Sequence, residues 1–407
     1  MSGWDSVPLG ELAADEKSAI SKPYGSAILK EDYRAEGVPV VRGVNLANGI
    51  FNDGDFVYID EELAAKMPGA EMRSGDLVVT HRGTVGQVSM IPRLSRFPRY
   101  VASTSHVKVR LDEAKAVPEF YYYWFASPQG QHSILSNVST VGVPGLVQPV
   151  ATVKKLQVPC PRPAEQRAIA QILGALDDKI AANRRLADVG FVLQTSLWRK
   201  HSDGCHGVPL LSIATPHLGG TPPRADESAW EGAIPWASVR DMSAAKGGVL
   251  LTTTETISIE ASQSARRLAT LPERSVVLTA RGTVGKVVTV GVPCAINQSA
   301  YGFIPVPGRG VALRCSIESV VDELKARAHG SVFSTITMST LEGALVPDTN
   351  DRAWDAVCVD LESIEDRRVA ALCECEILAR TRDELLPLLM SGKIRLKDAE
   401  AAVSEVL

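Results

Sequence analysis

The stretch Val79-Thr80-His81-Arg82-Gly83-Thr84-Val85-Gly86-Gln87-Val88 recurs as Leu278-Thr279-Ala280-Arg281-Gly282-Thr283-Val284-Gly285-Lys286-Val287. The two stretches are 199 residues apart, and the five letters RGTVG are identical in both. Because solenoid repeats recur every 20–50 residues or so, this long period indicates one globular domain used twice. Weaker similarities between the two copies occur in the same order. Val38-Pro39 and Ile234-Pro235 lie upstream, Thr104-Ser105 and Gln298-Ser299 downstream, and Val158-Pro159 and Val346-Pro347 further downstream.

Each copy is followed by a stretch with helical periodicity. Apolar residues recur every three or four positions over 164–200, and again over 361–389 in a heptad pattern. Such a stripe fits a helix packed on its own domain or two helices packed on each other. A length of about 37 residues, roughly 55 Å, exceeds one domain and favours a helical spacer. The predicted seam residues are Leu173, Leu176 and Ile180, with Leu361, Ile364, Leu378 and Leu385.

Composition and charge limit the classes of protein to which the chain can belong. The 407 residues predict two or three domains, and 45% apolar with 22% charged residues is typical of globular proteins. The net charge of −4 lies at the C-terminus, because residues 348–407 carry 14 acidic and 8 basic side chains. Residues 1–163 and 201–347 are each neutral, so charge neither supports nor excludes nucleic-acid binding.

The sequence also predicts a compartment. Its apolar runs are too short to span a membrane, and the N-terminus has no basic region followed by an apolar core. The seven cysteines are an odd number and form no CxxC pair. We therefore expect a cytoplasmic protein with reduced thiols and no membrane association.

Between the helical stretches, each copy predicts a mixed α/β fold. Short β-rich runs are separated by Gly and Pro, and the aromatic stretch 118–127 and the stretch 316–329 are predicted to be helical. The predicted strands cover 39–44, 56–59, 76–80, 87–90 and 106–111 in the first copy, and 249–254, 275–279, 286–290 and 301–306 in the second.

Motifs for catalysis are missing from the sequence. It contains no Walker loop, no G-x-G-x-x-G after a strand, no amino-methyltransferase motif and no G-x-S-x-G elbow. His201, Cys205 and His206 cluster in a polar stretch that favours an interdomain loop over a metal site. Two copies without a duplicated nucleophile, metal ligand or paired acid indicate a bivalent binding protein. A scaffold that assembles proteins on a coiled coil, and a hydrolase with an unrecognised site, remain alternatives.

Several further motifs follow one another along nearly the whole chain. They are the stretch from Pro161 to Arg167 that opens the central helix, Gly219-Gly220-Thr221-Pro222-Pro223, Ile234-Pro235-Trp236, Asn297-Gln298, and Arg382 to Gly392. Together and in this order they resemble a known family, the specificity subunits (HsdS) of type I restriction–modification systems. The second copy departs from the family's pattern with Pro347-Asp348-Thr349-Asn350, and the first with Lys22-Pro23-Tyr24.

The resemblance implies two target-recognition domains, at 1–163 and 201–350, in inverted orientation. They would be joined by two long antiparallel helices, a central spacer helix at 164–200 and a C-terminal helix and tail at 351–407. Each domain would read half of an asymmetric, bipartite site on double-stranded DNA. Methyltransferase subunits would dock on the helices and motor–nuclease subunits would join them. The chain itself would be non-catalytic, with S-adenosylmethionine, ATP and magnesium on its partners.

The repeat also directs the choice of DNA-contacting residues. Its glycines predict a tight turn rather than a direct DNA contact. Arg82 and Arg281 would contact phosphate or pair with a carboxylate inside the fold. Elements shared by two domains that read different sequences suit structure or phosphate contact, so base readers are expected where the copies differ. The candidates are His81, Arg82, Thr84, Gln87, Ser103, Thr104, Ser105 and His106, with Arg240, Arg281, Thr283, Lys286, Asn297 and Gln298.

Overall fold

The computed structural model describes residues 4–24, 27–139, 144–328 and 335–407. The chain divides into two compact units. The first unit comprises residues 1–178 and 378–407, and the second comprises residues 179–377. Each unit therefore contains one copy of the repeat together with parts of both long helices.

The first unit contains two four-stranded sheets. One has the strand order β2-β9-β6-β7 and is antiparallel throughout; the other has the order β4-β3-β8-β5, in which β3 and β8 are parallel. Short helices α1 to α4 and a β1–β12 pair complete the domain. The bounds are β1 Ser6–Pro8, β2 Ile20–Ser21, β3 Val38–Val41, β4 Val57–Ile59, α1 Glu61–Ala65, β5 Glu71–Met72, β6 Leu77–Thr80, β7 Val88–Met90, β8 Tyr100–Ala102, β9 His106–Val109, α2 Pro118–Ala126, α3 Pro128–Leu135, β10 Val138–Ser139, β11 Gly145–Leu146, α4 Pro149–Lys155 and β12 Gln157–Pro159.

The second unit repeats this topology. Its five-stranded sheet has the order β14-β21-β18-β19-β16, and β17-β15-β20 forms a second sheet whose β15 and β20 are parallel. The predicted mixed α/β fold and duplication are confirmed, because β21-β18-β19 corresponds to β9-β6-β7 and β17-β15-β20 to β4-β3-β8. The bounds are β13 Gly207–Pro209, α6 Leu210–Ile213, β14 Pro216–Leu218, β15 Trp230–Ala237, α7 Val239–Ala244, β16 Val249–Leu250, β17 Glu255–Ile257, α8 Ile259–Ser264, β18 Val276–Thr279, β19 Val287–Val290, β20 Ala295–Ile296, β21 Ala300–Phe303, α9 Gly310–Ala328, α10 Met338–Glu342 and β22 Leu345–Pro347.

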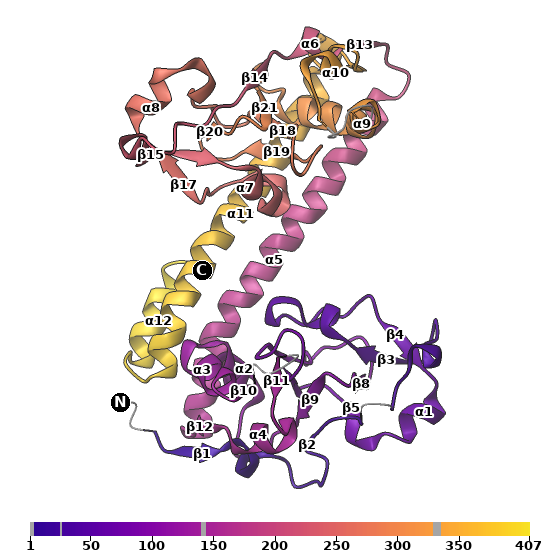
Figure 1. Cartoon of the computed structure of the whole chain (residues 1–407), viewed down its shortest axis with the longest axis vertical. Helices are drawn as coiled ribbons and strands as arrows, with labels where there is room; N and C mark the ends of the chain where they lie inside the picture. The colour runs from indigo at the N-terminus through magenta and orange to yellow at the C-terminus, as the bar shows by residue number, and fades with distance from the viewer. Residues whose placement is uncertain (1–3, 25–26, 140–143, 329–334) are drawn as a thin grey trace. The chain divides into compact units, whose positions relative to one another are not determined.

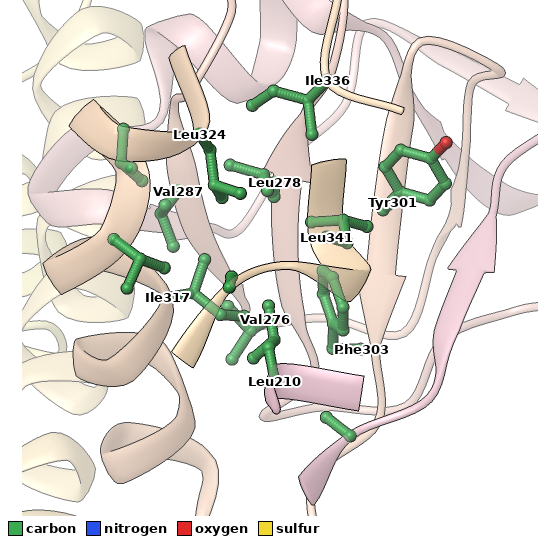
Figure 2. Packing of buried hydrophobic residues seen from close by; sticks show 14 of the residues in the cluster. Leu210, Val276, Leu278, Val287, Tyr301, Phe303, Ile317, Leu324, Ile336 and Leu341 are labelled. Carbon is green, nitrogen blue, oxygen red and sulfur yellow. The ribbon is translucent and has the colours of Figure 1, made fainter. Parts of the chain in front are cut away.

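A large apolar core of the second unit lies between one face of the five-stranded sheet and helices α9 and α10 (Figures 1 and 2). Val276 and Leu278 of β18 and Phe303 of β21 belong to one cluster with Ile317 and Leu324 of α9. All five side chains are buried. Alternation along the strands sends every second residue to this face, so β18 presents its other residues to a separate core.

Two long helices, α5 (Pro163–Ser202) and α11 (Asp355–Met390), pack on each other within each unit. In the second unit Asn183 of α5 bonds Glu374 of α11, and Gln194 bonds Leu361. The residue numbers increase along α5 while those of the bonded residues on α11 decrease, so the two helices are antiparallel there. Six predicted seam residues are buried and Ile364 is half-buried; the six are Leu173, Leu176, Ile180, Leu361, Leu378 and Leu385.

Several element boundaries differ from the sequence prediction. Helix α9 begins at Gly310, six residues before the start of the helix predicted over 316–329, and α12 (Leu396–Ser404) was not predicted. The eight-residue β15 was also missed, because Gly232 and Pro235 within it are typical of loops. Among the described residues, no helix is long and apolar enough to cross a membrane. The seven cysteines are all free.

Candidate functional site

The RGTVG stretch is a tight turn in both copies. Gly86 donates its backbone N–H to the Thr80 carbonyl at 3.1 Å, and Gly285 does the same to Thr279 at 2.8 Å. Gly86 has a φ of +90° and Gly285 a φ of +82°, in the left-handed region that favours glycine. The repeated sequence is therefore explained by the β6–β7 and β18–β19 connections, as predicted.

Each turn is also pressed against a helix of its own copy. A Cβ on Gly86 would lie 2.9 Å from a methyl of Leu135 in α3, and a Cβ on Gly285 2.9 Å from a methyl of Val321 in α9. The Gln131 side chain also donates to the Gly86 carbonyl at 3.0 Å. These contacts fix the position of each turn relative to its sheet. Arg82 is the first residue of the turn in the first copy, and Arg281 in the second.

The first copy brings most of its predicted residues to one end of its two sheets. The backbone N–H of His81 donates to the Ser105 carbonyl at 2.9 Å, and its Nε2 lies 3.0 Å from the Thr104 carbonyl. Thr84 donates to the Gln87 side-chain oxygen at 2.8 Å, and the Gln87 amide bonds the Leu46 carbonyl. The β6–β7 turn and the β8–β9 loop therefore form one surface.

His106 lies beneath that surface rather than on it. Its Nδ1 is 2.8 Å from the hydroxyl of Ser103, and its side chain is 1% exposed. Burial, with a smaller contribution from His81, lowers the pKa of His106 to about 4. Burial also lowers the pKa of His81. Both imidazoles are thus neutral at neutral pH. His81 holds the β8–β9 loop to the turn, and His106 bonds Ser103 within that loop.

The second copy builds the corresponding surface from different side chains. Ala280 and Arg281 both donate their backbone N–H groups to the Ser299 carbonyl, at 2.7 and 3.1 Å. Asn297 donates its backbone N–H to the Ala237 carbonyl at 3.0 Å, and its side-chain oxygen accepts from Ser299. The β18–β19 turn and the β20–β21 loop are joined in this way.

Arg240 reaches the same place from a third element. It lies in the first turn of α7, whose start is capped by Ser238 and Asp241. The neighbouring Val239 lies 3.5 Å from where a Cβ of Gly282 would be. Lys286 is half-buried at the end of the turn. Arg240, Arg281 and Lys286 thus bring three cations to one end of the second copy.

Exposure divides the predicted residues into groups. His81 and His106 are buried. Six are exposed: Arg82, Thr84, Arg240, Arg281, Thr283 and Gln298. The half-buried ones are Gln87, Ser103, Thr104, Ser105, Lys286 and Asn297. Across the described ranges neither Arg82 nor Arg281 pairs with a carboxylate, so both guanidinium groups face solvent.

One contact at this surface was missed from the sequence. Thr221 donates its hydroxyl to the side-chain oxygen of Gln298. Its neighbour Gly219 runs so close to the β20–β21 loop that a Cβ would lie 2.2 Å from the Asn297 carbonyl. The Gly219-Gly220 pair was the signal that could have revealed this approach, because glycine permits close backbone contact.

The surface offers cations and hydrogen-bonding groups rather than a reactive centre. Over the described parts of the chain, no three His, Cys, Asp or Glu side chains are grouped so that they could hold a metal ion. Exposed arginine and threonine side chains in both copies, together with Gln298 in the second, suit phosphate contact and base-edge hydrogen bonding.

Comparison with known proteins finds a family match over part of the chain and solved structures that resemble it. Residues 1–189 match the model of the family described as "Type I restriction modification DNA specificity domain". The type I restriction–modification S subunit of M. genitalium is 16% identical, with a TM-score of 0.63 over 95% of this chain and 96% of that one. The HsdS subunit of Thermoanaerobacter tengcongensis is 17% identical over 96% and 97%, with a TM-score of 0.36.

Proposed function

We propose that the chain is a type I DNA specificity subunit in which each copy reads half of a bipartite DNA target. The match of residues 1–189 to the type I restriction modification DNA specificity domain family supports this proposal. The recognition domains would be residues 1–163 and 201–350. The family is that of a non-catalytic subunit. Because the copies carry different side chains on the same turn, the two halves of the target should differ.

One observation carries this proposal: an identical turn presents an exposed arginine in each copy, while the neighbouring side chains change. His81 and Gln87 of the first copy become Ala280 and Lys286 in the second. Arg82 and Arg281 would bind phosphate, which positions a protein without reading sequence. Lys286, Arg240 and Gln298 would read bases in the second half, since Arg or Lys binds guanine and Gln binds adenine.

We further propose that α5 docks the methyltransferase subunits. Four apolar side chains stay exposed on it at helical spacing; they are Leu186 at 47%, Val189 at 62%, Val192 at 64% and Leu193 at 46%. A contiguous apolar stripe on a charged helix is typical of a protein–protein contact. Motor–nuclease subunits would join the complex, and S-adenosylmethionine, ATP and magnesium would bind to the partners.

The two recognition domains carry no net positive charge, so DNA affinity should depend on those partners. Each phosphate neutralised by a basic side chain adds to the salt-dependent part of binding, and balanced domains neutralise few. We therefore expect the chain alone to bind DNA weakly. We also place the complex in the cytoplasm, where its free cysteines would remain reduced.

The test is a methylation map. The chain is co-purified with its cognate methyltransferase subunit and incubated with genomic DNA, and every methylated site is sequenced. We expect one asymmetric motif with two parts, and replacing residues 1–163 with the first domain of another family member should change one part only. Absence of any bipartite motif would contradict the proposal, and a change in both parts would contradict the independence of the copies.

Docking has its own experiment with a matched control. Val189→Asp and Val192→Asp each place a charge in the exposed stripe on α5 and should weaken methyltransferase binding at least tenfold. Val359→Asp changes a residue of similar exposure, 70%, on α11 outside the stripe and should leave binding unchanged. Equal losses in the three variants, measured by calorimetric titration, would exclude α5 as the docking face.

A further inference from the structure

We propose, on the basis of the proposed function, that two equivalent side-chain junctions seat each recognition domain on the long helices and thereby set the gap between half-sites. Each junction joins a helix of one domain to both long helices within one unit. The first-unit junction consists of Tyr123, Asp177 and Arg382. The second-unit junction consists of Gln194, Arg314, Glu365 and Arg368.

In the first-unit junction the Asp177 carboxylate accepts hydrogen bonds from both of the other side chains. The Tyr123 hydroxyl of α2 donates to Asp177 Oδ2 of α5 at 2.8 Å. Arg382 of α11 donates from Nη1 to Asp177 Oδ1 at 2.7 Å. Burial and the nearby Asp177 carboxylate raise the pKa of Tyr123, so its hydroxyl remains a donor. The side chains of Asp177 and Arg382 are 31% and 28% exposed.

In the second-unit junction the amide of Gln194 is the centre. Its nitrogen donates to Glu365 Oε2 of α11 at 2.9 Å, and its oxygen accepts from Arg314 Nη2 of α9 at 3.0 Å. Arg368 donates to the same amide oxygen at 3.2 Å and to the Ala187 carbonyl of α5 at 2.9 Å. Nη2 of Arg368 donates to the Gly247 carbonyl at 2.6 Å. Gln194, Arg314, Glu365 and Arg368 are at most 2% exposed.

The two junctions occupy repeat-related positions. The apolar seams of the two helices align at an offset of 188 residues, and the same offset relates Asp177 to Glu365 and Gln194 to Arg382. Tyr123 and Arg314 come from α2 and α9, the domain helices that begin beside the long helices. The residue types changed between the copies, but the connection of the three helices was kept. Packing alone does not require polar side chains at the same positions in both copies.

Each domain helix is also attached at its first turn, which makes the junction a second point of contact. The backbone N–H of Val117, at the start of α2, donates to the Gln166 side chain of α5 at 2.7 Å. The N–H of Val311, in the first turn of α9, donates to Glu362 of α11 at 2.9 Å. One attachment leaves a helix free to pivot, whereas two fix its direction. The junctions should therefore control the angle at which each domain leaves the helices.

A small change in that angle matters on DNA. One base pair occupies about 3.4 Å of the duplex axis, so a domain displaced by a few ångströms would favour a gap that is one pair longer or shorter. Loosening a junction should broaden the accepted gaps while the bases that each domain reads stay the same. A residue needed only for stability would lower methylation at every gap alike.

The experiment uses the full chain with its methyltransferase subunit and a DNA library. The library keeps both half-sites and varies the gap in steps of one base pair. Tyr123→Phe removes only a hydroxyl, Asp177→Asn removes only a charge, and Gln194→Met keeps the length of the side chain. Lys179→Gln is the matched control, because the ion pair that it removes, between Lys179 and Glu374 at 3.1 Å, joins the two long helices to each other. Thermal unfolding verifies that each variant is folded.

We expect wild type and Lys179→Gln to methylate targets of one gap length. In the three junction variants, the ratio of methylation at that gap length to methylation at the neighbouring gap lengths should fall about tenfold. The inference is overturned when folded junction variants keep the wild-type gap preference, whatever their overall rate. It is equally overturned when Lys179→Gln broadens the gap as much as they do. A wild-type complex that methylates no bipartite target contradicts the proposed function instead, so the two failures are distinguishable.

Discussion

The sheet that carries the glycine turn has the same strand order in both copies, but different side chains lie on one of its faces. In the first copy Ser89 of β7 and Lys108 of β9 both pair with Val78 of β6, so all three side chains lie on one face. In the second copy the corresponding partners of Val277 are Val288 and Gly302. His106 of the first copy corresponds in the same way to Ala300.

The difference leaves the first copy with polar atoms in its core. The hydroxyl of Ser89, Nε2 of His106 and Nζ of Lys108 are buried without a hydrogen-bond partner among the described residues. In the second copy apolar side chains occupy that face, and a Cβ on Gly302 would lie 2.3 Å from a methyl of Leu271. The strand pairing and the glycine turn thus specify this fold, and they tolerate either a polar or an apolar core behind them.

The junctions differ in burial, which predicts the largest effect. Arg368→Met removes the nearer cation of the Glu365 carboxylate, which is 0% exposed, and leaves it only Arg274 at 4.0 Å; the change should cost about 3–5 kcal/mol of unfolding free energy. Arg382→Met breaks a half-exposed pair and should cost about 1 kcal/mol or less. Urea unfolding of the two variants measures the difference. Equal losses would show that burial does not distinguish the junctions.

A second control keeps the shape of the buried site. Arg368→Met combined with Glu365→Gln removes both charges of the pair, and the Gln194 amide still has a neutral partner. The double variant should recover part of the stability that Arg368→Met loses, because no unpaired charge remains buried. Failure to recover any stability would assign the loss to packing rather than to electrostatics.

The buried His106 predicts an intermediate effect that depends on pH. Its folded pKa is about 4, below the unfolded value of about 6.5, so between these values only the unfolded chain binds the proton. Stability from this residue is therefore present above pH 6.5 and is lost as the pH falls towards 4, by up to about 3 kcal/mol. His106→Ala copies the residue of the second domain and should flatten this dependence.

The measurement is the unfolding free energy of wild type and variant between pH 4 and pH 7. His132→Ala, at an exposed site of the same copy, serves as the control and should leave the pH dependence unchanged. His106→Ala also opens a cavity, which lowers stability at every pH, so the slope with pH is the diagnostic quantity. An unchanged slope would mean that the His106 imidazole accepts a proton in the folded state.

The sequence predicted features that repeat along the chain. The duplication, the two long helices and the glycine turn all appear as patterns that one local rule explains. The core behind the turn could not be predicted, since nothing in the alternation of β9 shows that Lys108 occupies the place of Gly302. The junctions were hidden for a similar reason. Arg382 interrupts the heptad visibly, but its partner Asp177, and Tyr123, which bonds the same carboxylate, are far away along the chain.

The smallest expected effect compares two glycines of one turn. Gly83 and Gly86 both have a positive φ, so alanine at either position carries a backbone cost of about 1 kcal/mol. Nothing lies within 4 Å of a Cβ on Gly83, whereas a Cβ on Gly86 would meet Leu135 at 2.9 Å. Gly86→Ala should therefore destabilise the first copy by about 1 kcal/mol more than Gly83→Ala. If urea unfolding gives equal losses, α3 yields to the turn, and the turn is held by its own hydrogen bonds alone.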